Sequence, residues 1–251
     1  MLAMVAVWSA GRASAEPIAV RFVENPNYAL LALSSTSGEI LADGELAQTA
    51  AGHGALQSRL TFRFKDGSLS DETIVFSQNK VFRLLSHHLI QRGRAFGHEI
   101  DAAFDRASGG YRVRYREKAG ADEERLEGSV EMPADLYNGL ASTLIRNLAG
   151  ERGEGRMLAF TPKPRLLRVE YVPGDQESFR VGGASRTARR YVMKVEVPGI
   201  AGALATVIGK DPPDVTYWIA QPIPAFLKFE GSMFLNGPVW RIEPTGARWT
   251  K

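Results

Sequence analysis

Carboxylate and imidazole side chains that could carry out acid–base chemistry lie close together in one part of the chain. Asp71 and Glu72 precede the adjacent histidines His87 and His88. A carboxylate can orient an imidazole ring for general acid–base catalysis, so Asp71, Glu72 and His88 are the catalytic candidates, with His87 as the other imidazole that a carboxylate could orient. No nucleophile is identifiable beside them, and the chain contains no G-x-S-x-G, H-E-x-x-H, Walker A or G-x-G-x-x-G motif. A hydrolase is therefore only a second alternative function.

The same residues do not predict a metal site. His87 and His88 are adjacent, and neighbouring side chains of a strand point to opposite faces, so the two rings cannot share a metal ion. The acidic run 66–72 has fewer carboxylates than a calcium loop needs and its glycine is misplaced, so we interpret it as a turn. We expect no metal and no cofactor.

The chain contains no cysteine. Disulfides, thiol nucleophiles and thiolate metal ligands are thereby excluded, as is the lipid-modified cysteine of bacterial lipoproteins. The folded protein must be stabilised by its core alone.

The elements that must position the candidates form a three-stranded meander over Leu60–Gln91. Residues 60–64 alternate apolar with polar side chains, which is the period of a strand with one buried face. Asp66-Gly67 and Asn79-Lys80 supply the two reversals. The third segment, Val81–Gln91, also fits one face of a helix; we favour a strand because the flanking segments are strands.

A clean β pattern follows at 111–116, where Tyr, Val and Tyr alternate with three arginines. A return strand through Leu126 and Val130 would place Glu123 or Glu127 beside these arginines. We interpret the arginine row as a solvated sheet face neutralised by glutamates; the alternative is an anion-binding ladder.

From Asp135 the period changes to that of a helix. Leu136, Leu140, Leu144 and Leu148 recur every four residues, which predicts one long helix with a single buried stripe over Asp135–Leu148. Beyond the charged run 151–156 the period-two pattern resumes, is interrupted at 198–210, and then continues to Glu243.

These patterns predict a mainly β fold: a curved antiparallel sheet or incomplete β-barrel wrapped around one principal helix. We expect a single β-rich domain over 16–251, with a possible internal boundary near 151–156. A hollow of this kind is a usual place for an apolar ligand. Six residues are the candidates to line it: Phe62, Phe64, Phe76, Leu140, Leu144 and Trp218.

The ends of the chain and its charge bear on compartment and partners. A short apolar run followed by Ala13-Ser14-Ala15 predicts a signal peptide over 1–15, and hence a periplasmic or secreted protein.

The 31 basic and 28 acidic residues are nearly balanced, and aromatic residues and arginines occupy opposite faces of their strands, so we expect no nucleic-acid partner. No apolar run is long enough for a transmembrane helix. The small, apolar segment 198–210 is either a buried segment or a loop in peripheral contact with a membrane.

Three runs considered together add a resemblance. They are FRFKDGSLSDETIVFSQNKVFRLLSHHLIQRG, MPADLYNGLASTLIRNL and the closing GKDPPDVTYWIAQPIPAFLKFEG with GPVWRIE. As a set they resemble a family of exported bacterial β-rich proteins of unknown function, which is distantly similar to periplasmic lipoprotein-carrier-like domains. The resemblance covers most of the chain from about residue 60. It implies the fold and the compartment, and it carries over no catalytic or binding residue.

The sequence thus predicts a non-catalytic periplasmic protein that binds a lipid or other apolar molecule in the hollow of its sheet. The first alternative is an envelope scaffolding or interaction module without a cavity. The sequence does not determine the oligomeric state.

Overall fold

The computed structural model describes residues 16–118, 120–181, 184–196, 214–245 and 249–250. Eight strands come first: β1 Asn27–Ser35, β2 Ile40–Ala50, β3 Ala55–Phe64, β4 Leu69–Asn79, β5 Val81–Arg92, β6 Glu99–Asp105, β7 Gly110–Arg116 and β8 Glu124–Ser129. One helix and seven strands follow: α1 Ala141–Asn147, β9 Gly153–Phe160, β10 Pro164–Val181, β11 Ala184–Glu196, β12 Val215–Gln221, β13 Phe226–Gly231, β14 Trp240–Pro244 and β15 Trp249–Thr250.

All fifteen strands found in the described residues belong to one antiparallel sheet. The strand order is β15-β10-β11-β12-β13-β14-β1-β2-β3-β4-β5-β6-β7-β8, and β9 pairs with β10 on the edge that β15 also uses. Strands that follow each other in the chain pair with each other, except β8 with β9 and β14 with β15. Two pairs join strands that are distant in the chain, β1 with β14 and β10 with β15. The sheet does not close into a barrel.

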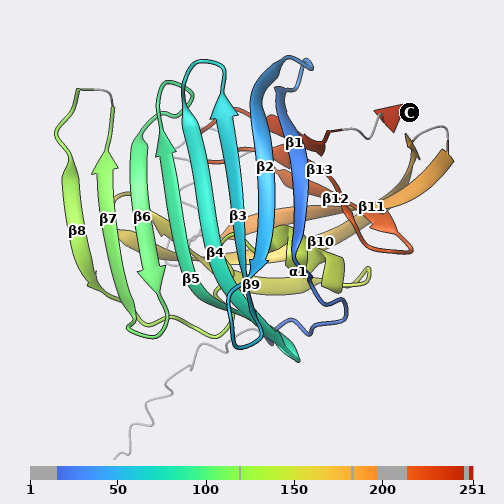
Figure 1. Ribbon diagram of the computed structural model, residues 1–251, viewed down its shortest axis with the longest axis horizontal. Helices are drawn as coiled ribbons and strands as arrows, with labels where there is room; N and C mark the ends of the chain where they lie inside the picture. Colours follow the sequence, from blue (N-terminus) through green and yellow to red (C-terminus); the bar gives the residue numbers. More distant parts are fainter. Residues whose placement is uncertain (1–15, 119, 182–183, 197–213, 246–248, 251) are drawn as a thin grey trace, which may run out of the picture.

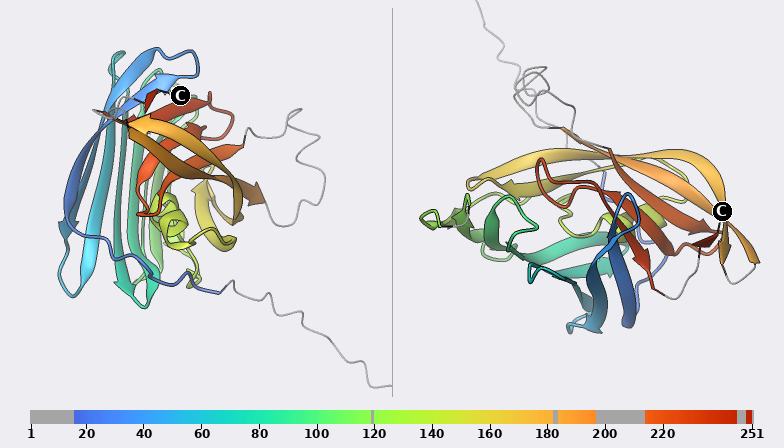
Figure 2. Two further views of the ribbon diagram at one scale, coloured as in Figure 1. Left: turned by 90° about the vertical axis from the view of Figure 1, so that its right-hand side faces the viewer. Right: turned by 90° about the horizontal axis from the view of Figure 1, so that it is seen from above.

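The sheet curves so that its two halves face each other. Strands β1–β8 form a broad layer, and β9–β13 cross over one face of that layer, with α1 between them (Figures 1 and 2). We call the covered face of β1–β8 the inner face and the opposite one the outer face. The predicted fold class, a mainly β protein with a curved antiparallel sheet around a helix, is confirmed.

The meander over Leu60–Gln91 is also confirmed, as β3, β4 and β5. Gly67 adopts the positive φ of 86° that its turn requires, and Lys80 takes a φ of 61° in the tight reversal between β4 and β5. The helical alternative for Val81–Gln91 is wrong, since the segment is strand β5. The interpretation of the whole run 66–72 as a turn is wrong in part, because β4 already begins at Leu69.

The helix is much shorter than the leucine spacing predicts. Residues 135–140 are not helical: Tyr137 N–H donates to the Arg156 carbonyl at 2.9 Å, and Arg156 N–H donates to the Asp135 carbonyl at 2.8 Å, so this segment pairs with the edge of β9. Gly139, with a φ of 69°, breaks the helical backbone before α1 begins. The leucine stripe itself is buried as predicted, with Leu136, Leu140 and Leu144 fully covered.

The core divides into three clusters. The main cluster joins α1 and the 135–140 segment to inner-face residues of β3–β7 and to β9–β12. The second cluster gathers Phe62, Phe64 and Phe96 with Trp240 and Ile242. The third is a small group of Phe179, Ala188, Trp218 and Leu227 within the C-terminal strands.

Candidate functional site

The six candidate ligand residues are distributed over all three clusters. Phe76, Leu140 and Leu144 lie in the main cluster, whereas Phe62 and Phe64 lie in the second. Trp218 belongs to the third, where Lys228 Nζ stands 3.7 Å above its ring. None of the six is more than 8% exposed. They pack against protein side chains, and the structure does not bring them together around one site.

A hollow lined by these residues around the helix would place Phe62 and Phe64 against α1, and this expectation is wrong. Both side chains point to the inner face, as the alternation predicts, but Phe64 packs against Phe96 and Trp240 with ring centroids 5.4 and 5.3 Å away. Alternation determines the face of a strand that a residue occupies. It does not say which distant element covers that part of the face.

The three catalytic candidates are also separated. Asp71 lies on the outer face, where both of its carboxylate oxygens accept hydrogen bonds from Arg59 at 2.9 and 2.5 Å. His88 lies on the same face but pairs with Asp101 at 2.8 Å. Glu72 points to the inner face, so Asp71, Glu72 and His88 form no common site.

Glu72 instead pairs with His87, the other imidazole that the sequence analysis considered. The distance from His87 Nε2 to Glu72 Oε1 is 2.8 Å, and the His87 ring stacks on Phe104 with centroids 5.1 Å apart. In this contact Nε2–H donates the hydrogen bond and the Glu72 carboxylate accepts it. His87 is only 3% exposed, and its buried Nδ1 has no hydrogen-bond partner among the described residues. A substrate has no access to that nitrogen, so the pair is a buried polar contact rather than a catalytic dyad.

Tyr217 of β12 lies near this pair from the opposite half of the sheet. Burial raises the pKa of Tyr217 well above its usual range, and the nearby Glu72 charge adds to the shift. The phenol therefore stays protonated at physiological pH. Burial also raises the pKa of Tyr171, so the interior tyrosines do not serve as bases.

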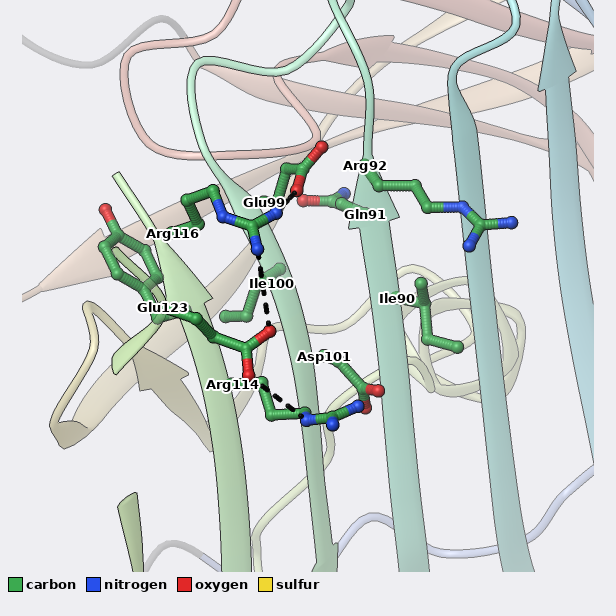
Figure 3. Close-up of a pocket in the computed structure, with 10 residues that line it drawn as sticks. Ile90, Gln91, Arg92, Glu99, Ile100, Asp101, Arg114, Arg116 and Glu123 are labelled. Atoms are coloured by element: carbon green, nitrogen blue, oxygen red, sulfur yellow. Dashed lines mark hydrogen bonds and ion pairs between the residues drawn. The ribbon is translucent and has the colours of Figure 1, made fainter. Parts of the chain in front are cut away.

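A shallow polar pocket of about 130 Å³ lies over β5–β7 (Figure 3). Its charged side chains neutralise each other: Arg116 is 2.6 Å from Glu99, and Glu123 is 3.6 Å from Arg114 and 3.8 Å from Arg116. The hydrogen bond from Arg125 and the arginine charges lower the pKa of Glu123, which therefore remains ionised. Glu123 thus occupies the place beside the arginines that the sequence predicts for it.

A groove of about 290 Å³ lies between the segment before β1 and the β12–β13 turn. Its apolar walls are unusually exposed, with Phe22 44%, Val23 62% and Ile223 81% accessible. Glu24 and Arg146, both largely buried, form an ion pair in the lining of the groove. The sequence analysis missed this groove because no spacing rule relates residues 22–24 to residue 223, which meet only after folding.

Two further features were searched for in the described part of the chain. Within it, no group of three or more histidine, aspartate and glutamate side chains is arranged to hold a metal ion. Among the residues that the structure describes, no helix has the length and apolar character needed to cross a membrane. Residues 1–15 and 198–210, which carry the predicted signal peptide and membrane contact, lie outside the described residues.

Comparison of the chain with protein-family models, with curated proteins and with solved structures found no match. The resemblance to an exported β-rich family therefore stays a prediction from the residues that carry it.

Proposed function

We propose that this protein is a non-catalytic interaction module of the bacterial envelope. It binds partners through its solvent-exposed surface rather than in an internal cavity. The packing of the interior carries the proposal: the six residues expected to line a hollow are at most 8% exposed and divide among three clusters. A filled interior favours a module without a cavity over a carrier that encloses its ligand. The proposed compartment rests on the signal-like run that ends at Ala15.

Native mass spectrometry of the protein purified from the periplasm tests this function. We expect the mass of the processed polypeptide without any co-purifying lipid. A lipid that stays bound until the protein is denatured would contradict a module with a filled interior.

A second candidate, binding of a lipid or other apolar molecule, is favoured by the groove beside β1. Phe22, Val23 and Ile223 expose apolar surface there, and the groove volume of about 290 Å³ is near the lower limit for small-molecule sites. An acyl chain lying along these side chains would be covered on one side only. This arrangement needs no hollow inside the sheet.

The second candidate is tested with a fluorescent fatty acid as the probe. Ile223→Glu would place a charge in the groove, and we expect roughly tenfold weaker binding, since contact with one large apolar side chain is worth about 1.5–3 kcal/mol. Leu235→Glu is the matched control, because Leu235 is 57% exposed and does not line the groove. Equal effects of the two substitutions, or no binding by the unmodified protein, would exclude the groove as a lipid site.

A further inference from the structure

The chain itself covers one end of the sheet. At β9, the N–H and carbonyl of Arg156 bond to the backbone of Asp135 and Tyr137. The N–H and carbonyl of Leu158 bond to the side chain of Asn138, both at 2.9 Å. The outward-facing backbone groups at these two positions of β9 are thus satisfied within the molecule, so this part of the edge is closed to further strands.

The other end of the sheet is β8, whose free edge pairs with no strand among the described residues. Figure 1 shows β8 at the margin of the broad layer with no described strand beyond it. Opposite residues of an antiparallel pair alternate between those that exchange backbone hydrogen bonds and those that do not. Val130 N–H donates to the Gly109 carbonyl at 3.0 Å, and this pair continues the β7–β8 register. The backbone groups that face β7 are therefore those of Gly128, Leu126 and Glu124.

It follows that Arg125, Glu127 and Ser129 direct their N–H and carbonyl groups away from the sheet. No backbone partner for these groups is found among the described residues. The side chains of Arg125 and Glu127 project from the outer face and are exposed. An extended strand that pairs with this edge would meet three donors and three acceptors in a row.

The charges on this edge select one way for two copies to pair. Antiparallel pairing about a twofold axis must place outward-directed residues opposite each other, so in the central part of β8 the axis passes Arg125, Leu126, Glu127 or Gly128. An axis at Gly128 places Glu127 opposite Ser129 and pairs no opposite charges of β8. An axis at Arg125 or Glu127 places two like charges directly opposite, which is unfavourable. An axis at Leu126 places Arg125 of each copy opposite Glu127 of the other, and Leu126 opposite Leu126.

We propose that β8 docks a second copy of this chain, antiparallel and centred on Leu126, so that the sheet continues across a twofold axis. Two Arg125–Glu127 pairs lie on its outer face. Leu126, which already packs against the main cluster, meets its counterpart on the inner face. Charged residues on an edge strand often prevent pairing by repulsion. In this register Arg125 and Glu127 of the two copies attract each other, so these charges do not prevent the β8 strands of two copies from pairing.

The interface is short, so the two copies bind with low affinity and the dimer forms only as the protein concentration rises. The proposed dimer does not depend on the proposed function, because binding of envelope partners and pairing of two copies are measured in separate experiments.

Exchanging the charges at positions 125 and 127 tests the pairing, with sedimentation velocity over a concentration series as the measurement. The unmodified protein is expected to shift from monomer to dimer as its concentration rises. Arg125→Glu makes both positions acidic and Glu127→Arg makes both basic, so each variant alone should stay monomeric where the unmodified protein dimerises. An equimolar mixture of the two variants should dimerise again, because every opposed pair then carries opposite charges. Arg168→Glu, at the exposed pair of Arg168 on β10 and Glu154 on β9, is the control and should dimerise normally.

A backbone substitution provides an independent test. Glu127→Pro removes an N–H that points away from β7, so it deletes an intermolecular donor and no hydrogen bond within the sheet. We expect a monomer with unchanged circular dichroism. An unmodified protein that is monomeric at all concentrations, a mixture that fails to dimerise, or a proline variant that still dimerises would each overturn the proposal.

Discussion

One hydrogen bond joins the buried His87 to the partly exposed Glu72. Its partners stand on neighbouring strands in positions set by the β4–β5 register, in which His87 lies opposite Ile74. Since His87 Nδ1 is already unpaired, the Nε2 contact is the one hydrogen bond that the ring makes within the described part of the chain. Its loss would leave a buried imidazole with no hydrogen bond.

Glu72→Ala should therefore lower the free energy of unfolding by about 1–3 kcal/mol, the cost of leaving a buried polar group unsatisfied. Glu72→Gln should cost less, because its amide oxygen can still accept from Nε2. Urea titration followed by circular dichroism measures both. Glu39→Ala, at an exposed turn, is the control and should have almost no effect. Equal losses for the alanine and glutamine variants would contradict the hydrogen-bond explanation.

His98 contributes a pH dependence to stability. It packs between Tyr115 and Phe234, and burial lowers its pKa from the ordinary value. The unfolded chain, with a histidine pKa of about 6.5, then binds the proton before the folded protein does. Stability should consequently fall as the pH drops through about 6.5.

His98→Gln removes this titration and keeps a neutral side chain of similar size. Between about pH 7.5 and about pH 5, we expect the variant to lose less unfolding free energy than the unmodified protein. Urea titrations at several pH values measure the difference. Parallel pH profiles for the two proteins would show that His98 does not contribute.

At the scale of elements, the segment 135–140 has two tasks that a helix could not perform together. It pairs with β9 and so covers that edge of the sheet, and it brings the chain into the interior where α1 begins. Gly139 is needed at the transition for its positive φ and for lack of space: a Cβ there would lie 2.6 Å from the Ile74 side chain. The leucine spacing predicts the buried stripe but not this change of backbone.

Gly139→Ala should be more destabilising than the same change at a glycine that has only the positive φ. Gly38 has a φ of 92°, and a Cβ added there would meet no atom within 4 Å, so Gly38→Ala isolates the backbone cost. That cost is about 1–2 kcal/mol. The additional loss at Gly139 comes from the contact with Ile74. Thermal unfolding of both variants measures it, and equal losses would show that Ile74 moves aside freely.

At the scale of the molecule, both large clusters draw residues from the two ends of the chain. The N-terminal strand β1 pairs with β14, and Tyr217 of β12 packs against the main and the second cluster alike. Neither cluster can be lost without exposing apolar surface of the other. The described part of the chain should therefore unfold as one cooperative unit.

Leu144→Ala in the main cluster and Trp240→Ala in the second test this cooperativity. We expect losses of about 2–5 and about 3–5 kcal/mol, respectively, each within a single transition. Near-ultraviolet and far-ultraviolet circular dichroism should report coincident midpoints. A variant with two separated transitions would indicate that the clusters unfold independently.

Local sequence patterns were sufficient to predict the period of most elements, and through it the fold class, the three-strand meander, the buried leucine stripe and the glutamate beside the arginine row. These features depend on contacts between near neighbours in the chain, which alternation and turn residues encode directly. Three other outcomes emerged only from the folded chain: Phe62 and Phe76 belong to different clusters, residues 135–140 pair with β9, and the six predicted ligand residues are buried against other side chains. They depend on which distant strands meet, and local periodicity contains no information on that pairing.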